Sequence, residues 1–167
     1  NVELNVCSST IIYGKKFDAV LGKTYEGLFN ECKNTKNVNY LSFLNNKKII
    51  ELLKKMHIFA HPSVWPETSC IAAIEAMAAG CEVVTTNLGA LNETCSPFGA
   101  FVNFDKNFDN LEKEYSKVLS NSIKNYWSDE NQNKLELQRK TINKTYSWNT
   151  RSVEWKNFFD KARKLKV

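Results

Sequence analysis

An α/β fold, with a parallel sheet flanked by helices, is predicted by two features of this sequence. Short strand-like runs alternate with amphipathic helical runs over residues 2–104, and short loops join them, as in βαβ crossover units. The residues from about 110 onward are helical in pattern. The 167 residues are enough for one full hydrophobic core. We therefore expect one Rossmann-like domain of three layers, with long C-terminal helices packed on one side.

The first half of the chain predicts three strands and two helices. Alternating apolar residues at the start of 2–14 predict a strand and its exit loop, and a second strand is expected over 37–44. Near-helical spacing predicts helices over 16–32 and 45–56, the latter capped by Asn45 or Asn46. The run HIFAHPS is a short buried strand that Pro62 stops.

The second half predicts two more strands between helices. Residues 69–80 form a helix closed by Gly80, EVVTT is a strand followed by the loop NLGALNE, and GAFVNF is the last strand. Three helices follow, over 111–123, 130–146 and 148–165. Ligands of parallel α/β sheets bind beyond the carboxyl ends of the strands. The loops after Gly14, Ser63 and Thr86 are therefore the candidate site.

Composition and spacing exclude several classes of protein. The net charge of +5 comes without an aromatic-interleaved basic stripe, so we expect no nucleic-acid partner. Five cysteines without a CxxC pair indicate reduced thiols of a cytoplasmic protein rather than disulfides or a zinc site. No apolar run approaches 18 residues, which disfavours a membrane span. The first strand lacks the G-x-G-x-x-G of a Rossmann dehydrogenase.

The middle of the chain has an unusual distribution of charge. No Lys or Arg occurs between Lys55 and Lys106, although acids remain there. Glu67 is expected just before the helix of residues 69–80, and Glu75 about two turns inside it. Between the two acids, backbone N–H groups and two hydroxyls lie at the positive end of the helix dipole, at Thr68, Ser69 and Cys70.

Two interpretations of this segment stay open from the residues alone. A ligand across the helix N-terminus could meet both acids, and a nucleotide sugar has the required diphosphate between two hydroxylated rings. Alternatively, both acids face solvent, and the segment lacks Lys because it is the most buried βαβ unit. The two explanations of the missing charge are compatible.

The run HPSVWPETSCIAAIEAMAAG, followed by VVTTNLGALNET, resembles the donor-binding half of group 1 (family four) retaining glycosyltransferases, which have the GT-B fold. The resemblance also covers residues 39–63 and the closing YSWNTRSVEW. Two acids separated by seven residues, then EAMAAG and a GxxxE loop, form a specific combination. The resemblance implies that residues 1–167 are the nucleotide-sugar-binding C-terminal lobe, and that an acceptor-binding lobe precedes them.

The resemblance also implies a role for each matching residue. Glu67 is the catalytic candidate, because it would contact the transferred sugar or stabilise the developing oxocarbenium charge. Glu75 would hold the ribose hydroxyls, and Glu93 would brace the loop that flanks the diphosphate. Backbone near Tyr40 to Phe43 would take the edge of the base. The remaining donor-binding candidates are Thr68, Ser69, Cys70, Thr86, Gly89, Ala90, Leu91, Ser42 and Phe43.

Some family features differ or are absent in this sequence. Ser42 stands where the family usually has Gly, His57 where it has Asp, and Asn92 where Pro is common. We expect His57 and His61 to be structural. The family's Arg and Lys, which neutralise the leaving diphosphate, would lie before residue 1. Because residue 1 is not Met and a strand follows at once, we expect the chain to begin inside a longer protein.

The resulting prediction is a retaining, metal-independent glycosyltransferase. Its donor would be UDP- or GDP-linked, it would need no cofactor or metal since no DxD run occurs, and peripheral membrane contact stays open. Alone, this lobe should bind donor weakly and turn over nothing. A non-catalytic nucleotide-sugar or interaction module would lack the preceding lobe. A sugar-nucleotide epimerase of the same fold would convert a UDP-sugar without an acceptor.

Overall fold

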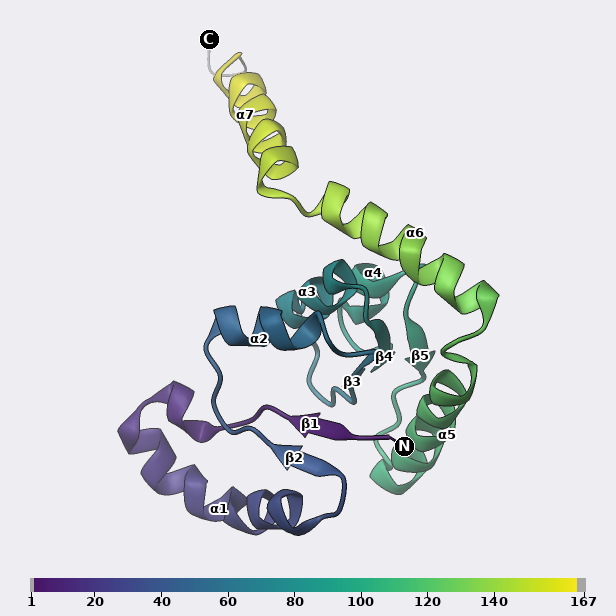
Figure 1. Ribbon diagram of the computed structural model, residues 1–167. Coiled ribbons are helices and arrows are strands. Elements are labelled where there is room, and N and C mark those ends of the chain that lie inside the picture. Colours follow the sequence, from purple (N-terminus) through teal and green to yellow (C-terminus); the bar gives the residue numbers. More distant parts are fainter. Residues whose placement is uncertain (1, 165–167) are drawn as a thin grey trace. The chain divides into compact units, whose positions relative to one another are not determined.

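The computed structural model describes residues 2–164 (Figure 1). For residues 12–13 and 15–22 it describes the backbone alone. The chain divides into two compact units, an N-terminal unit up to Ile49 and a C-terminal unit from Ile50 onward. Parallel strands and helices build both units, which confirms the predicted α/β class. None of the described helices is both long and apolar enough to cross a membrane.

The N-terminal unit is a single βαβ crossover. Strands β1 (Leu4–Val6) and β2 (Val38–Tyr40) pair in parallel, and the 3₁₀ helix η1 (Thr10–Tyr13) and helix α1 (Lys15–Asn34) connect them. The Tyr40 hydroxyl donates a 2.8 Å hydrogen bond to the Ser8 carbonyl, and the Phe29 ring stacks on the Tyr40 ring. These contacts hold the end of β2 against its own crossover.

Helix α2 (Asn46–Leu53) begins where the sequence predicts a cap. The Asn45 side-chain oxygen accepts a 3.0 Å hydrogen bond from the backbone N–H of Lys48, which satisfies one of the open amides of the first turn. Of the two candidate caps, Asn45 is therefore the one used.

The C-terminal unit contains a three-stranded parallel sheet in the order β3 (Ile58–His61), β4 (Glu82–Thr86) and β5 (Ala100–Val102). Helices α3 (Ile71–Ala79) and α4 (Leu91–Cys95) connect the strands, and helix α5 (Phe108–Asn125) packs on the sheet. One core cluster joins Val84 and Val102 to Tyr115, whose hydroxyl donates to the Val84 carbonyl over 2.7 Å. The side chain of Val83 points to the opposite face from that of Val84 and is also fully buried, so both faces of β4 are covered.

The long C-terminal helices pack less uniformly than the sequence predicts. Helix α6 (Asp129–Thr145) lies against α3, and its Gln138 amide donates to the carbonyls of Met77 and Cys81. Helix α7 (Trp148–Lys164) buries none of its described residues. Its aromatic residues Trp155, Phe158 and Phe159 contact one another instead, because they lie three and four positions apart on one helix face.

Two element predictions have informative outcomes. Helix α3 ends at Gly80, whose φ of +100° gives the left-handed cap that glycine adopts without strain. The predicted loop after β4 instead contains α4, a five-residue helix whose N-cap, Ala90, makes no side-chain capping bond. Helix α4 therefore lacks the capping residue by which a sequence marks a helix start.

Candidate functional site

The candidate site lies in the C-terminal unit, where the loops after β3 and β4 meet. Glu67 and Gly89 form an isolated parallel bridge, and the backbone N–H of Ala90 donates to the Glu67 carbonyl over 2.8 Å. The bridge joins the loop before α3 to the loop before α4. It therefore fixes the backbone of the predicted catalytic acid.

Gly89 is required at this bridge for steric reasons. A Cβ atom there would lie 2.6 Å from the carbonyl oxygen and 2.7 Å from the nitrogen of Glu67, and its φ of +60° is left-handed. The sequence predicts a close backbone approach at Gly89, but toward a diphosphate. The contact with Glu67 was missed, because the two residues are far apart along the chain and belong to different loops.

Three threonine hydroxyls donate hydrogen bonds to backbone carbonyls around the candidate site. Thr85 donates to the His61 carbonyl over 2.9 Å, Thr86 to the Ser63 carbonyl over 2.7 Å, and Thr94 to the Ser69 carbonyl over 2.8 Å. All three threonines are buried. Each bond satisfies a carbonyl, at the end of β3 or in the loop that follows it, which would otherwise be costly to remove from water.

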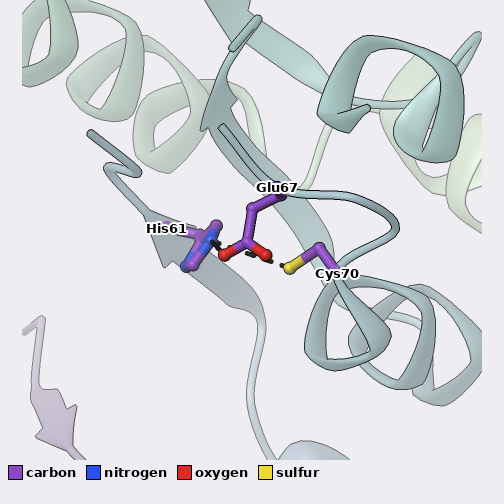
Figure 2. Close-up of side chains that lie close together, drawn as sticks. All are labelled: His61, Glu67 and Cys70. Carbon is purple, nitrogen blue, oxygen red and sulfur yellow. Dashed lines mark hydrogen bonds and ion pairs between the residues drawn. The ribbon is translucent and has the colours of Figure 1, made fainter. Parts of the chain in front are cut away.

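The Glu67 carboxylate meets two side chains that the sequence left outside the catalytic role (Figure 2). His61 Nε2 lies 3.6 Å from Glu67 Oε1, and Cys70 Sγ lies 3.6 Å from the same His61 nitrogen. His61 and Glu67 keep 27% and 31% of their side-chain surface exposed, so solvent and small ligands reach them. The end of β3, the loop and the helix N-terminus each supply one member of this cluster.

Cys70 is the N-cap of α3 and has an unusual backbone. Its φ of +52° is left-handed, which costs a residue with a Cβ atom about 1 kcal/mol. Burial, and more weakly the nearby Glu67 carboxylate, raises the pKa of the Cys70 thiol, and the Ala73 amide partly offsets this. Without a bound cation the group is therefore a neutral thiol near pH 7.

The helix that follows carries the other predicted acid. Glu75 is partly buried and is the fifth residue of α3, so it lies little more than one turn inside the helix rather than two. Thr68 and Ser69, which precede the N-cap, are exposed. The backbone N–H groups in the first turn of α3 point toward the N-terminal end of the helix, the end that Thr68 and Ser69 precede.

The other candidates around β4 differ in accessibility. The side chains of Thr86 and Leu91 are fully buried, which leaves backbone groups as their means of reaching a ligand. Ala90 is partly buried next to the bridge. Glu93 is exposed in the first turn of α4, while its neighbour Thr94 makes the bond that braces the Ser69 loop.

Ser42 and Phe43 belong to the N-terminal unit. They line a largely apolar cavity of about 710 Å³ together with Leu28, Phe29 and Ile49. Ser42 has a φ of +54°, so the position where the family usually has glycine adopts a backbone that favours glycine.

The other histidine, His57, makes structural contacts. The His57 ring meets the rings of Tyr126 and Trp127 edge to face, with centroids 4.9 and 5.3 Å away. The His57 carbonyl accepts the backbone N–H of Glu82 at the start of β4. These contacts agree with the expected structural role of His57, whereas His61 lies inside the candidate site.

One of the comparisons with known proteins identifies a family. A family model described as glycosyl transferases group 1 matches residues 9–146, which include every residue of the candidate site. No curated protein matches the chain. Because the family match covers most of the sequence, the chain belongs to the group 1 glycosyl transferases.

Proposed function

We propose that residues 1–167 are the donor-binding lobe of a retaining glycosyltransferase of the GT-B fold. The family implies a nucleotide-sugar donor and a sugar-transfer reaction. In this proposal the donor is UDP- or GDP-linked, the acceptor site belongs to a preceding lobe, and the reaction needs no metal. The observation that carries the proposal is the bridge that holds Glu67 beside the N-terminus of α3.

Glu67 is in a suitable place to meet the transferred sugar. Its backbone is fixed on one side by Gly89 and Ala90, and its partly exposed carboxylate lies next to His61 and Cys70. A carboxylate held in this way accepts hydrogen bonds from sugar hydroxyls. It also stabilises positive charge at the anomeric carbon, since a fixed charge needs no reorganisation during the reaction.

Glu75 and the N-terminus of α3 would bind the ribose and the diphosphate of the donor. A carboxylate accepts two hydrogen bonds from the vicinal hydroxyls of ribose, which is the role proposed for Glu75. The open N–H groups at the start of α3 and the positive end of its dipole favour the diphosphate. No Lys or Arg occurs between Lys55 and Lys106, so the neutralising cations come from another segment.

The proposed reaction proceeds on one face of the sugar. The bond between the anomeric carbon and the diphosphate oxygen breaks as the acceptor oxygen approaches from the same side. The departing phosphate oxygen takes the acceptor proton, so no side chain of this lobe has to act as a base. Glu67 stabilises the positive charge that develops at the anomeric carbon while the bond to the diphosphate oxygen breaks and the bond to the acceptor oxygen forms.

Calorimetry with nucleotides tests the two acids separately. We expect Glu75→Ala to weaken both the nucleoside diphosphate and its sugar by about tenfold or more, because each loses a charged hydrogen-bond acceptor. We expect Glu67→Ala to weaken only the sugar-bearing nucleotide. The titrations use UDP, GDP and their glucose and mannose conjugates with the whole chain.

The control is Glu112→Ala, which removes an exposed acid from α5 and should change no affinity. Circular dichroism of each variant checks that the fold is retained. Equal affinities in the wild type, Glu67→Ala and Glu75→Ala would reject the assignment of the site.

A further inference from the structure

We propose that His61, Glu67 and Cys70 form a three-ligand site for Zn²⁺ at the candidate active site, and that the bound ion excludes the donor sugar. The first half of this proposal depends only on the three side chains. The second half rests on the proposed function, because it assumes that Glu67 contacts the sugar.

The distances within the cluster fit a tetrahedral ion. One ligand atom from each residue lies within 4.8 Å of the other two. Typical zinc bonds of about 2.3 Å to sulfur and about 2.0 Å to nitrogen place those two ligand atoms about 3.5 Å apart in a tetrahedral site. The separation of Cys70 Sγ and His61 Nε2 is 3.6 Å, so these ligands are already close to the required geometry.

The donor set selects the kind of ion. A thiolate, an imidazole and a carboxylate suit Zn²⁺, whereas Mg²⁺ and Ca²⁺ prefer oxygen ligands alone. When the ion binds, a Zn–S bond forms and the Cys70 thiol proton passes to solvent. Three protein ligands leave the fourth position to water, and the partial exposure of His61 and Glu67 gives the ion a route in.

The three ligands are held by separate parts of the fold, which limits the reorganisation that binding requires. His61 is the last residue of β3, and its carbonyl accepts a hydrogen bond from the Thr85 hydroxyl. The Phe59 ring stacks on the His61 ring, with the two centroids 5.6 Å apart. Glu67 is fixed by the bridge to Gly89. The backbone of Cys70 is fixed at the start of α3, because its own carbonyl accepts hydrogen bonds from the backbone N–H groups of Ala73 and Ile74.

The ion and the donor sugar compete for the same carboxylate. Zinc bonding to Glu67 removes the acceptor that the sugar hydroxyls use and adds positive charge where the oxocarbenium charge develops. We therefore expect Zn²⁺ to weaken the nucleotide sugar more than the nucleoside diphosphate. Zinc would act as an inhibitor, which is compatible with a transfer reaction that needs no metal.

Cobalt substitution tests the site on the whole chain without any nucleotide. Co²⁺ bound by a thiolate gives a sulfur-to-metal charge-transfer band, and its visible bands report tetrahedral geometry. We expect both features in the wild type and their loss on addition of Zn²⁺. We expect Cys70→Gly and His61→Ala to weaken Co²⁺ binding by at least about tenfold, because loss of even a hydrogen-bond partner of a metal ligand typically costs about 10–100-fold in affinity and these variants remove a ligand itself.

Cys70→Gly is a safe variant for the fold, because glycine adopts the left-handed backbone of this position without strain. Cys7→Ser is the matched control, since it removes an exposed thiol from the N-terminal unit and should leave the cobalt spectrum unchanged. Absence of the charge-transfer band in the wild type, or an equal band in Cys70→Gly, would overturn the metal site.

A second titration separates this proposal from the proposed function. Nucleotide sugar and nucleoside diphosphate are titrated with and without saturating Zn²⁺. A selective loss of sugar-nucleotide affinity supports the competition. A normal cobalt spectrum with equal affinities under both conditions would retain the metal site and reject the competition. Equal nucleotide affinities in the wild type, Glu67→Ala and Glu75→Ala, together with a normal cobalt spectrum, would reject the donor site and retain the metal site.

Discussion

Gly89→Ala is expected to lower the free energy of unfolding by about 2–4 kcal/mol and to abolish the preference for a nucleotide sugar over its nucleoside diphosphate. The added methyl group would lie 2.6 and 2.7 Å from backbone atoms of Glu67 and 2.9 Å from the Pro66 carbonyl carbon. Backbone atoms cannot rotate away as a flexible side chain can. The bridge to Glu67 therefore has to open, which releases the carboxylate from its place.

Urea unfolding and nucleotide calorimetry measure the two effects of Gly89→Ala. Gly80→Ala is the matched control, because Gly80 also has a left-handed φ but a Cβ there would meet only a flexible Arg139 side chain at 3.6 Å. We expect Gly80→Ala to lose about 1 kcal/mol from backbone strain alone and to keep the sugar preference. Equal losses in the two variants would show that contact with Glu67 contributes nothing.

Glu82→Ala is expected to have the second large effect, a loss of about 2–4 kcal/mol of unfolding free energy. Glu82 begins β4 and is only 5% exposed. Its two oxygens accept hydrogen bonds from the Ser122 hydroxyl over 3.0 Å and the Asn131 amide over 3.2 Å, and Lys134 Nζ lies 3.7 Å away. Removal of the carboxylate leaves a buried hydroxyl and a buried amide without this partner, and also creates a cavity.

Urea unfolding of Glu82→Ala is compared with that of Glu114→Ala. Glu114 pairs with Lys117 over 3.6 Å on the exposed face of α5, where an ion pair is worth at most about 1 kcal/mol. Glu82→Gln keeps the size of the side chain and should fall between the two. If Glu82→Ala cost no more than Glu114→Ala, the proposed tie between β4, α5 and α6 would be wrong.

Local signals predicted most of the elements because each one depends on neighbouring residues. The side chain of Asn45 marks the start of α2 by capping an amide three residues ahead, and Gly80 marks the end of α3 by its positive φ. The family match confirms the coarser part of the functional prediction, that the chain is a group 1 glycosyl transferase.

Contacts between distant residues explain what the sequence did not predict. Glu82 looked like one more acid in a segment without basic residues, and its burial depends on Ser122 and Asn131, which lie on later helices. The contact between His61 and Cys70 was not predicted, because nothing along the chain shows that the end of β3 meets the N-cap of α3. Periodicity reports which side chains share a face, but it does not report which loops meet.

The most direct test of the account is a crystal structure of this chain with a bound UDP- or GDP-sugar. We expect the sugar hydroxyls within hydrogen-bond distance of the Glu67 carboxylate, the ribose hydroxyls at Glu75, and the diphosphate at the N-terminus of α3. A donor bound with neither carboxylate in contact would contradict the account.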